Sequence, residues 1–252
     1  MLSWYRNQIS DHGLMPASAL LWRAGWAQTR ARLANKLLAA RYECPCCGWR
    51  GRRFYDYLET GYRAVNVECP QCASHGRHRL LKVWLDKEFG LAEKSGTGLI
   101  FAPEKALAEV WEMARGWRLY KLDIIAARGV DVLGDVQRLP FKDDAFDLLW
   151  CHHVLEQTPD DQASMRELRR VLRPQGELII SAGLSPNAET REFGFSDKRF
   201  SGNHRSYGQD FPQRLTDAGF TVENAGQGVQ EAERQRYGIS GDERFFRCRK
   251  SN

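Results

Sequence analysis

The stretch "GDVQRLPFKDDAFDLLWCHHVLEQTPDD", residues 134–161, decides the fold of this chain. Residues 146–152 within it form a short apolar run, which is typical of a buried strand. Residues 160–172 follow with apolar side chains at helical spacing, and a proline and a glycine end that pattern. A second apolar run at 177–182 completes the unit. The stretch therefore predicts a strand, a helix and another strand in succession.

The same alternation continues on both sides of this stretch. Helices are expected at 104–115 and 211–220, and strands at 99–102, 118–124 and 130–135. Strands that alternate with helices favour a parallel sheet covered on both faces. The last two strands, "TVENAG" and "ERFFRCRK", look like an antiparallel pair. We expect an α/β fold: a Rossmann-like, doubly wound, mostly parallel seven-stranded sheet with a closing antiparallel strand.

The 252 residues suffice for one medium domain and a small module. The polar, glycine-containing segment "EKSGTG" (93–98) is typical of a linker and marks the main boundary. The expected parts are an N-terminal basic amphipathic helix region, a cysteine module, a connecting helix with the linker, and the α/β domain, at residues 1–42, 43–75, 76–96 and 97–252.

The N-terminal region is predicted to be helical over residues 17–40. Trp22, Trp26, Leu33 and Leu37 share one face, and arginines and lysine occupy the others. We interpret the stripe as packing on the protein's own body, with a membrane surface as the alternative. No apolar run is long enough to span a membrane, and charged residues interrupt any signal-peptide core. We expect a cytoplasmic protein.

Charge is unevenly distributed. Residues 1–96 contain 15 Lys and Arg against 8 Asp and Glu, a net +7, whereas residues 97–252 contain 22 against 24, a net −2. A positive region of this kind is typical of a solvated basic face, and it also suits nucleic acid or another acidic partner.

Five of the seven cysteines lie within residues 44–72. Without a secretory signal, such a cluster indicates metal ligands rather than disulfides. Cys44, Cys47, Cys69 and Cys72 form two Cys-x-x-Cys pairs, the pattern of a structural zinc ribbon. Cys46, His75 and His78 are interpreted as lying outside the metal site. Four thiolates complete the tetrahedron, so the predicted site is closed and not catalytic.

The stretch quoted first, together with "RELRRVLRPQGELIIS" (166–181), resembles class I S-adenosylmethionine-dependent methyltransferases, and the type 11 methyltransferase domain most of all. The chain also resembles an uncharacterised subgroup in which a two-pair cysteine ribbon and a "RHRLL" helix precede a domain that opens with an "APE" turn. The resemblance covers roughly residues 43–220. It implies an enzyme that transfers a methyl group from S-adenosylmethionine.

Ligands of open parallel sheets bind beyond the carboxyl ends of the strands, and the resemblance assigns residues there to the cofactor. Asp123, at the end of the second strand, is expected to accept hydrogen bonds from the ribose hydroxyls. Asp135 and Val136 are expected at the adenine. Cys151 and His152, at the end of the fourth strand, are expected to face the methyl donor.

His153 follows those residues and is the candidate general base, because histidine titrates near neutral pH. It could equally hold its loop by hydrogen bonds. In the polar segment "SGNHRSYGQDF" (201–211), His204, Arg205 and Tyr207 are the candidate substrate-binding residues. Gln157 stands where the family usually has histidine.

The larger departure from the family is the turn after the first strand. "GLIFAPEKAL" (98–107) has Ala102, Pro103 and Glu104 where glycines are usual. S-adenosylmethionine has no pyrophosphate, so this turn need not bind phosphates and need only leave room for the amino-acid end of the methyl donor. These three residues are therefore kept as cofactor-binding candidates, with Glu104 either pairing with the donor's positive charge or beginning the next helix.

Three functions fit these features. The favoured one is a methyltransferase acting on a small molecule or a glycan, with zinc in an accessory module. The second is an RNA methyltransferase, because Trp49, Phe54 and Tyr55 are interleaved with arginines as in single-strand binders. The third is a non-catalytic protein that uses the fold for binding. The sequence specifies neither the methyl acceptor nor the oligomeric state.

Overall fold

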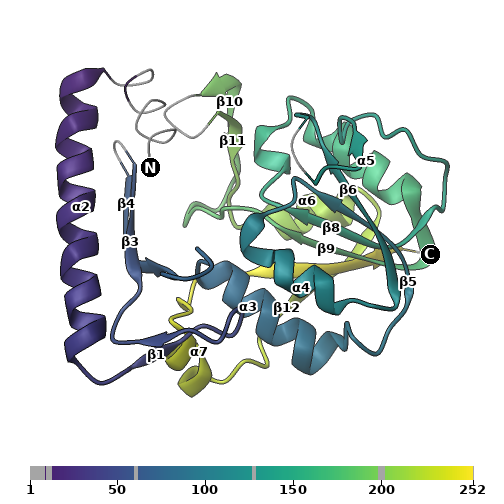
Figure 1. Ribbon diagram of the computed structural model, residues 1–252. Helices are drawn as coiled ribbons and strands as arrows, with labels where there is room; N and C mark the ends of the chain where they lie inside the picture. Colours follow the sequence, from purple (N-terminus) through teal and green to yellow (C-terminus); the bar gives the residue numbers. More distant parts are fainter. Residues whose placement is uncertain (1–8, 10–12, 60–61, 127–128, 198–201, 252) are drawn as a thin grey trace. The chain divides into compact units, whose positions relative to one another are not determined.

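The computed structural model of the chain describes residue 9 and residues 13–59, 62–126, 129–197 and 202–251 (Figure 1). The chain divides into two compact units. The first comprises Met1–Val83, Lys105–Glu109 and Val229–Glu243, and the second comprises Trp84–Glu104, Val110–Gly228 and Arg244–Asn252. The expected boundary at 93–98 lies inside the second unit, which already begins at Trp84 and contains the strand β5 (Gly96–Phe101).

The first unit contains two small antiparallel hairpins. β1 (Tyr42–Glu43) pairs with β2 (Arg50–Gly51), and β3 (Tyr55–Glu59) pairs with β4 (Tyr62–Glu68). The helices of this part are α2 (Leu14–Leu37), most of α3 (Gly76–Trp84) and α7 (Glu231–Tyr237). The sequence did not predict α7.

Arg79 joins the hairpins of the first unit to α7. Its guanidinium is fully buried and donates to the carbonyls of Ser74 and Val67 at 2.6 and 3.0 Å, and to those of Tyr237 and Gly238 at 2.6 and 2.9 Å. It also lies 4.0 Å from the ring centre of Phe54. A rigid, planar group with five donors suits such a position better than lysine would.

The tryptophan stripe of α2 is exposed, which corrects the expectation that it packs on the protein's own body. Trp22 and Trp26 are 73% and 59% exposed, and Leu33 and Leu37 are 53% and 74% exposed. The buried residues of α2 are Ala17, Leu20 and Ala31 instead. α2 contacts β3, and its large apolar side chains lie on a different face from these three residues.

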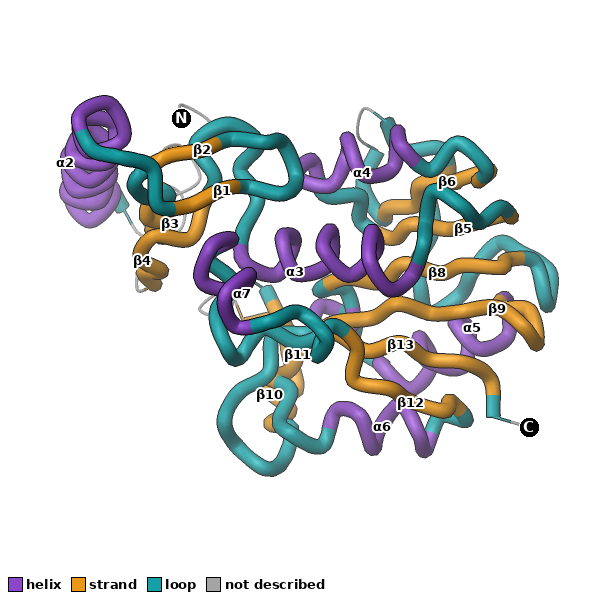
Figure 2. Tube along the Cα trace, turned by 90° about the horizontal axis from the view of Figure 1, so that it is seen from below, coloured by secondary structure: helices purple, strands orange, loops and turns teal. Residues whose placement is uncertain are grey.

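The second unit is built on a seven-stranded sheet in the order β12-β13-β9-β8-β5-β6-β7, which confirms the expected architecture (Figure 2). The five strands β5 to β9 are parallel, and β13 runs antiparallel to its neighbours β9 and β12. The remaining strand bounds are Trp117–Asp123 (β6), Val132–Leu133 (β7), Phe146–His152 (β8), Leu172–Ser181 (β9), Phe220–Ala225 (β12) and Phe245–Lys250 (β13).

Alternating side chains of the central strands are buried on both faces of the sheet. Leu149 and Cys151 of β8 pack in the main core with Met165 of α5 (Asp161–Val171) and Phe211 of α6 (Phe211–Asp217). Trp150 points to the other face, where its ring centre lies 4.6 Å from that of Trp111 in α4 (Ala108–Met113). Helices therefore cover both faces, as a doubly wound sheet requires.

Several expected elements differ in extent. The helix expected at 104–115 is a 3-10 turn, η2 (Lys105–Leu107), followed by the short α4. α3 ends in a π-helical turn, η1 (Leu85–Phe89). A hairpin of β10 (Arg191–Asp197) and β11 (Asn203–Ser206) was not predicted. No described helix is both long enough and apolar enough to cross a membrane.

Candidate cofactor site and metal centre

A cavity of 280 Å³ opens at the carboxyl ends of the parallel strands of the second unit. Strand ends and the turn η3 (Leu155–Gln157) surround it. Its position is where ligands of open parallel sheets bind, and its size approaches that of ordinary small-molecule pockets. The lining residues are Phe101, Ala102, Leu122, Asp123, Ile124, Gly134, Asp135, Val136, Gln137, His153, Val154, Gln157, Thr158 and Pro159.

Ala102 forms the turn that replaces the usual glycine loop. Its φ is 43°, in the left-handed region that glycine adopts without strain. Its amide donates to the Leu122 carbonyl at 2.8 Å, so it continues the sheet and lines the cavity. Pro103 and Glu104 are not lining residues. The Glu104 carboxylate lies 3.4 Å from Nε2 of His152, so the structure places it beside this buried ring and not in the cavity wall.

Asp123 and Asp135 lie at the ends of β6 and just beyond β7, and both line the cavity. Oδ1 of Asp123 accepts a hydrogen bond from the Ile125 amide at 3.1 Å. Asp135 is more fully engaged, because both of its oxygens accept from the Gln137 side chain, at 3.2 and 3.0 Å. Val136 is buried beside them. The structure thus brings together the three residues assigned to ribose and adenine.

Cys151 and His152 do not line the cavity. Cys151 is fully buried in the main core, and burial raises the pKa of its thiol well above the usual range. His152 is buried, with Nδ1 bonded to the Ser181 hydroxyl. The sequence placed these residues toward the donor because they end β8, but the alternation of side chains along the strand turns them into the sheet layers.

His153 is the histidine that reaches the cavity. It has a left-handed φ of 52°, and its Nδ1 lies 3.0 Å from Oε1 of Glu156. Glu156 is buried and also accepts from the Gly183 amide at 2.7 Å. Burial alone would raise the pKa of Glu156. The hydrogen bond and the electrostatic interaction with His153 outweigh burial, so the pKa of Glu156 is lowered. Glu156 therefore holds the His153 ring in a fixed orientation.

Arg205 and Tyr207 are buried side chains that hold η3 and α5. Arg205 donates to the carbonyls of Leu155, Thr158 and Pro159 at 2.7, 2.6 and 2.9 Å. The Tyr207 hydroxyl donates to Asp161 at 2.7 Å, and burial raises its pKa strongly. These bonds favour a positioning role over contact with a substrate.

His204 is half-buried and alternates with Arg205 along β11, so the two side chains lie on opposite faces of that strand. Substrate contact by His204 stays a prediction. Ser201, which begins the polar segment quoted for these residues, lies outside the described residues.

Sequence reasoning missed Gln137 as a site residue. Besides holding Asp135, its side-chain carbonyl accepts from the Asp160 amide at 2.9 Å, at the start of α5. Gln157 was noted only as a departure from the family, yet it lines the cavity. The sequence signal for both glutamines was a polar residue in a loop within a few positions of a strand end.

The four predicted cysteine ligands of the first unit converge. Their sulfurs all lie within 4.8 Å of one another, and the Cys44–Cys72 and Cys47–Cys69 sulfur distances are both 3.7 Å. Zinc bonds of 2.3 Å in a tetrahedron require sulfurs about 3.8 Å apart. These two distances match that geometry, so the arrangement is suited to one zinc ion.

The two cysteine turns are built alike. The amide four residues after the first cysteine donates back to its carbonyl, from Gly48 to Cys44 at 2.8 Å and from Ala73 to Cys69 at 2.9 Å. Both residues have left-handed φ, 73° and 59°. Each turn thereby directs two sulfurs at one point.

Neighbouring polar groups support the cluster without joining it. The Ser74 hydroxyl lies 3.1 Å from the Cys44 sulfur and 3.2 Å from that of Cys72. The Cys46 sulfur lies 3.8 Å from the His78 carbonyl and is not one of the four mutually close sulfurs. Nδ1 of His78 accepts from the His75 amide at 2.9 Å, and neither ring is part of the four-sulfur group. Their expected place outside the site agrees with this geometry.

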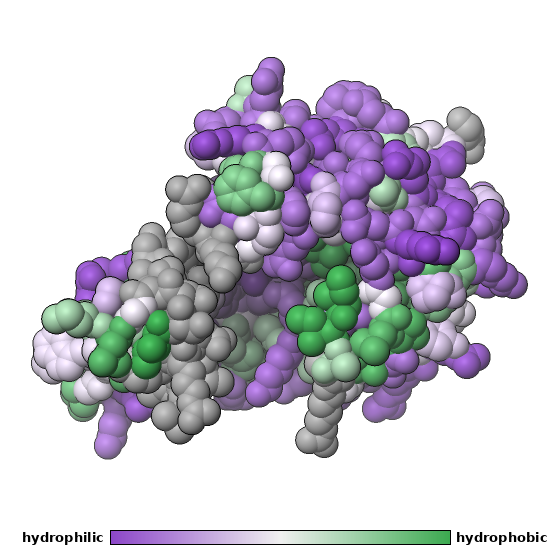
Figure 3. All heavy atoms as spheres, turned by 90° about the horizontal axis from the view of Figure 1, so that it is seen from above, coloured by the Kyte–Doolittle hydropathy of each residue, from purple (hydrophilic) through white to green (hydrophobic). Residues whose placement is uncertain are grey.

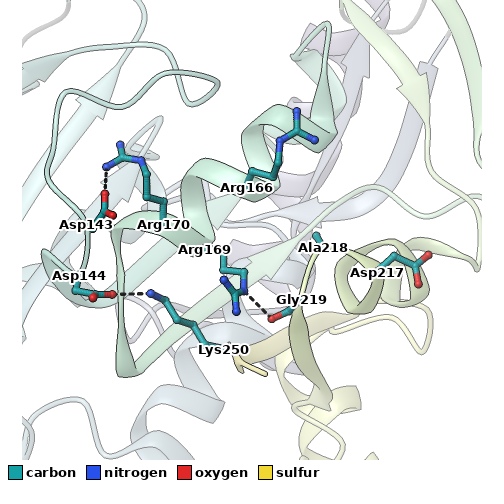
Figure 4. A pocket seen from close by; sticks show the side chains of 9 residues that line it. All are labelled: Asp143, Asp144, Arg166, Arg169, Arg170, Asp217, Ala218, Gly219 and Lys250. Carbon is teal, nitrogen blue, oxygen red and sulfur yellow. Dashed lines mark hydrogen bonds and ion pairs between the residues drawn. The ribbon is translucent and has the colours of Figure 1, made fainter. Parts of the chain in front are cut away.

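A second, larger cavity of 480 Å³ lies at the opposite edge of the sheet (Figure 4). Its charged groups are already paired. Arg170 lies 2.8 Å from Asp143, Lys250 lies 2.5 Å from Asp144, and Arg169 donates to the Gly219 carbonyl at 3.1 Å. It lies at the amino end of β8, so it is not the position at which this type of sheet binds its ligands.

Residues 104–180 match a family described as "Methyltransferase domain". The chain carries a class I methyltransferase domain. The match spans the cavity-lining residues from Leu122 to Pro159. The resemblance found in the sequence is thus confirmed for this part of the chain.

Curated relatives of the methyltransferase domain share only part of their length with it. A demethylmenaquinone methyltransferase of Mycolicibacterium paratuberculosis is 40% identical over 78 residues, 31% of this chain and 34% of the relative. The methyltransferase GfsG of Streptomyces halstedii is 45% identical over 49 residues, 19% of this chain and 18% of the relative. The chain thus spans about a third of the length of the first of these relatives.

Solved structures similar to the chain include a 1,6-didemethyltoxoflavin-N1-methyltransferase of Burkholderia thailandensis with bound 1,6-didemethyltoxoflavin and S-adenosylhomocysteine. It is 14% identical with a TM-score of 0.46, over 78% of this chain and 98% of that one. A SAM-dependent methyltransferase of Aquifex aeolicus is 18% identical with a TM-score of 0.43, over 67% and 87%.

Proposed function

We propose that the protein is an S-adenosylmethionine-dependent methyltransferase that binds the donor in the 280 Å³ cavity of its second unit. The observation that carries this proposal is the convergence of Asp123, Asp135 and Val136 on one cavity at the carboxyl edge of the sheet. The match of residues 104–180 to the methyltransferase domain supports it independently.

The residues present fit the donor. The Asp123 carboxylate provides acceptors for a pair of hydroxyl groups, and Val136 provides an apolar surface for a flat ring. Ala102 keeps the left-handed turn of the usual glycine and adds only a methyl group. When bound, S-adenosylmethionine supplies an electrophilic methyl group on a sulfonium. The chain's task is to hold donor and acceptor in line, which accounts for much of the acceleration in such transfers.

His153 is the candidate for accepting the acceptor's proton. Glu156 occupies Nδ1, so Nε2 is the ring nitrogen that would take the proton. A carboxylate bonded to the opposite nitrogen fixes the tautomer and the orientation of the ring, as in other histidine bases. Where the acceptor needs no deprotonation, the same pair would shape the cavity wall.

The proposed acceptor is a small organic molecule. The relatives are named demethylmenaquinone methyltransferases, so a demethylated quinol with a shortened side chain is the first compound to test. We also propose a structural zinc ion held by Cys44, Cys47, Cys69 and Cys72. Four thiolates leave no open position, so the ion's role would be to fold the first unit.

Calorimetric titration of the full chain with S-adenosylmethionine and with S-adenosylhomocysteine tests the donor site. We expect one site per chain for each. Methyl-labelled S-adenosylmethionine is then incubated with the quinol, a small-molecule fraction of cell extract and an RNA fraction. Absence of binding by folded, zinc-loaded protein would overturn the enzyme proposal. Binding with label only in RNA would overturn the small-molecule acceptor.

A further inference from the structure

The outward face of α2 carries an apolar stripe that nothing in the proposed enzyme accounts for. Met15, Trp22, Trp26, Leu33 and Leu37 are each more than half exposed. At 100° per residue they fall within about 60° of one another around the helix, roughly opposite the buried Ala17, Leu20 and Ala31. α2 thus has two apolar faces, one whose residues are buried and one whose large side chains are more than half exposed. Trp22 and Trp26 of the exposed face also line a 370 Å³ cavity with Leu58 and Val65 of β3 and β4.

The composition of the stripe differs from that of scattered surface residues. The rings of Trp22 and Trp26 are stacked: their centres lie 6.4 Å apart and their planes differ by only 3°. Aliphatic side chains extend the stripe on both sides of this pair, so it runs along most of the 24-residue helix. In Figure 3, apolar side chains lie among polar ones on the left, at the end of α2.

Cations flank the stripe on both sides. Arg23 and Arg30 lie along one edge, Arg32 and Lys36 lie along the other, and no Asp or Glu occurs between residues 13 and 42. This absence is unusual, because the chain as a whole contains nearly as many acids as bases, 32 against 37. Whatever covers the stripe must therefore tolerate or prefer a positive border.

We propose that α2 docks the protein on an anionic lipid bilayer, lying in the plane of the interface. Tryptophans at the interface, an apolar stripe and flanking cations are the features by which helices lie on membranes. A second copy of the chain fits less well, because it would bring eight helix cations together with no acid in either helix. A nucleic acid would pair with the arginines and tryptophans but would leave Met15, Leu33 and Leu37 in water.

The experiment is flotation of the full chain with two kinds of vesicle, phosphatidylcholine alone and phosphatidylcholine mixed with phosphatidylglycerol. We expect binding that is stronger to the mixed vesicles and weakens with added salt. Trp22→Ser with Trp26→Ser should weaken binding at least about tenfold, because the anchoring rings are lost. Phe195→Ser, which removes a 56% exposed ring from the second unit, is the matched control and should bind unchanged.

Charge variants test the border separately. Arg30→Gln with Lys36→Gln should weaken binding to mixed vesicles about fivefold for each charge removed. Arg115→Gln with Arg166→Gln, two exposed cations of the second unit, should have little effect. Circular dichroism verifies that each variant is folded.

Three outcomes would overturn the proposal. One is no flotation with either vesicle. Another is binding that the tryptophan and Phe195 variants lose equally. The third is binding of single-stranded oligouridylate, or self-association in sedimentation, that depends on Trp22 and Trp26 and is tighter than binding to either vesicle. All of these results are independent of whether the donor binds, so they are distinguishable from a failure of the proposed enzyme activity.

Discussion

Ala102 and His153 each lie one residue beyond the end of neighbouring parallel strands, β5 and β8, and both have left-handed backbone conformations, with φ of 43° and 52°. Both line the candidate donor cavity. Conformations of this kind cost about 1–3 kcal/mol each in residues other than glycine and tend to occur at functional sites. The two turns are thus under local strain that the rest of the sheet maintains.

Replacing Ala102 tests this strain. Ala102→Gly should leave the free energy of unfolding unchanged or raise it by up to about 1 kcal/mol, because relief of strain exceeds the entropy cost of glycine. Ala163→Gly, within α5, should lower it by about 1 kcal/mol. Urea unfolding measures both. Equal losses in the two variants would show that the Ala102 turn is not strained.

Asp123 should be necessary for donor affinity. Asp123→Asn removes a charged acceptor, and hydrogen bonds to charged groups contribute about 1.5–3 kcal/mol, so the Kd for S-adenosylhomocysteine should rise about ten- to a hundredfold. Asp131→Asn alters an exposed aspartate beyond the same strand, outside the cavity, and should leave the Kd unchanged. Calorimetry gives both values. An unchanged Kd in Asp123→Asn would remove this residue from the site.

Replacement of Arg205 should lower the stability of the fold, because its side chain holds backbone carbonyls and not a substrate. Arg205→Lys cannot reach three carbonyls at once, so the free energy of unfolding should fall by about 2–4 kcal/mol. Arg166→Lys, at a 65% exposed side chain, should change it by less than about 0.5 kcal/mol. If Arg205→Lys kept full stability and lost only turnover, Arg205 would contact substrate after all.

The sequence was sufficient for the sheet and for the residues at its carboxyl edge, because apolar runs and helical spacing are local signals. Asp123, Asp135 and His153 were found because they follow those runs directly. The missed features depend on distant contacts. Gln137 is recognisable only when Asp135 and Asp160 come together, and α7 is a short polar helix without an apolar pattern of its own.

The exposed stripe of α2 shows a different limit. Spacing placed Trp22 and Trp26 on one face, but it could not tell which face of the helix packs on the protein. Ala17, Leu20 and Ala31 form a second apolar face of smaller side chains, and these are the buried residues of the helix. Hydrophobicity alone ranks the tryptophan face higher, so it could not predict that the smaller side chains are the buried ones.

Removal of the metal should unfold the first unit. Zinc binding and folding are coupled in four-cysteine sites, so a chelator should release one zinc per chain and abolish the ordered hairpins. Cys47→Ser should purify with less zinc, and Cys46→Ser should keep it, because the Cys46 sulfur is not one of the four that converge. Metal analysis and circular dichroism measure these effects. A zinc-free chain of unchanged stability would contradict the assignment.

The ion pairs of the Glu177 carboxylate predict that the second unit loses stability in acid. Its carboxylate accepts from Arg249 at 2.6 Å and from Arg247 at 3.0 Å, and Lys94 lies 3.5 Å away. Burial raises its pKa, but the two arginines and Lys94 more than reverse this, so the folded pKa lies below its ordinary value of 4.5. A carboxyl group with a lowered folded pKa stabilises the protein above its unfolded pKa.

This contribution should disappear as the pH falls from about 4.5 through the folded pKa of Glu177. Glu177→Gln should therefore be less stable than the parent chain at neutral pH, by about 1–3 kcal/mol, and the difference should shrink as the solution is acidified below that value. Taking the difference at each pH cancels the titration of the other groups, including the cysteine cluster. Glu223→Gln, 63% exposed and 3.9 Å from Arg247, is the control and should track the parent chain. A difference that stays constant down to the lowest pH would show that Glu177 does not carry the acid sensitivity.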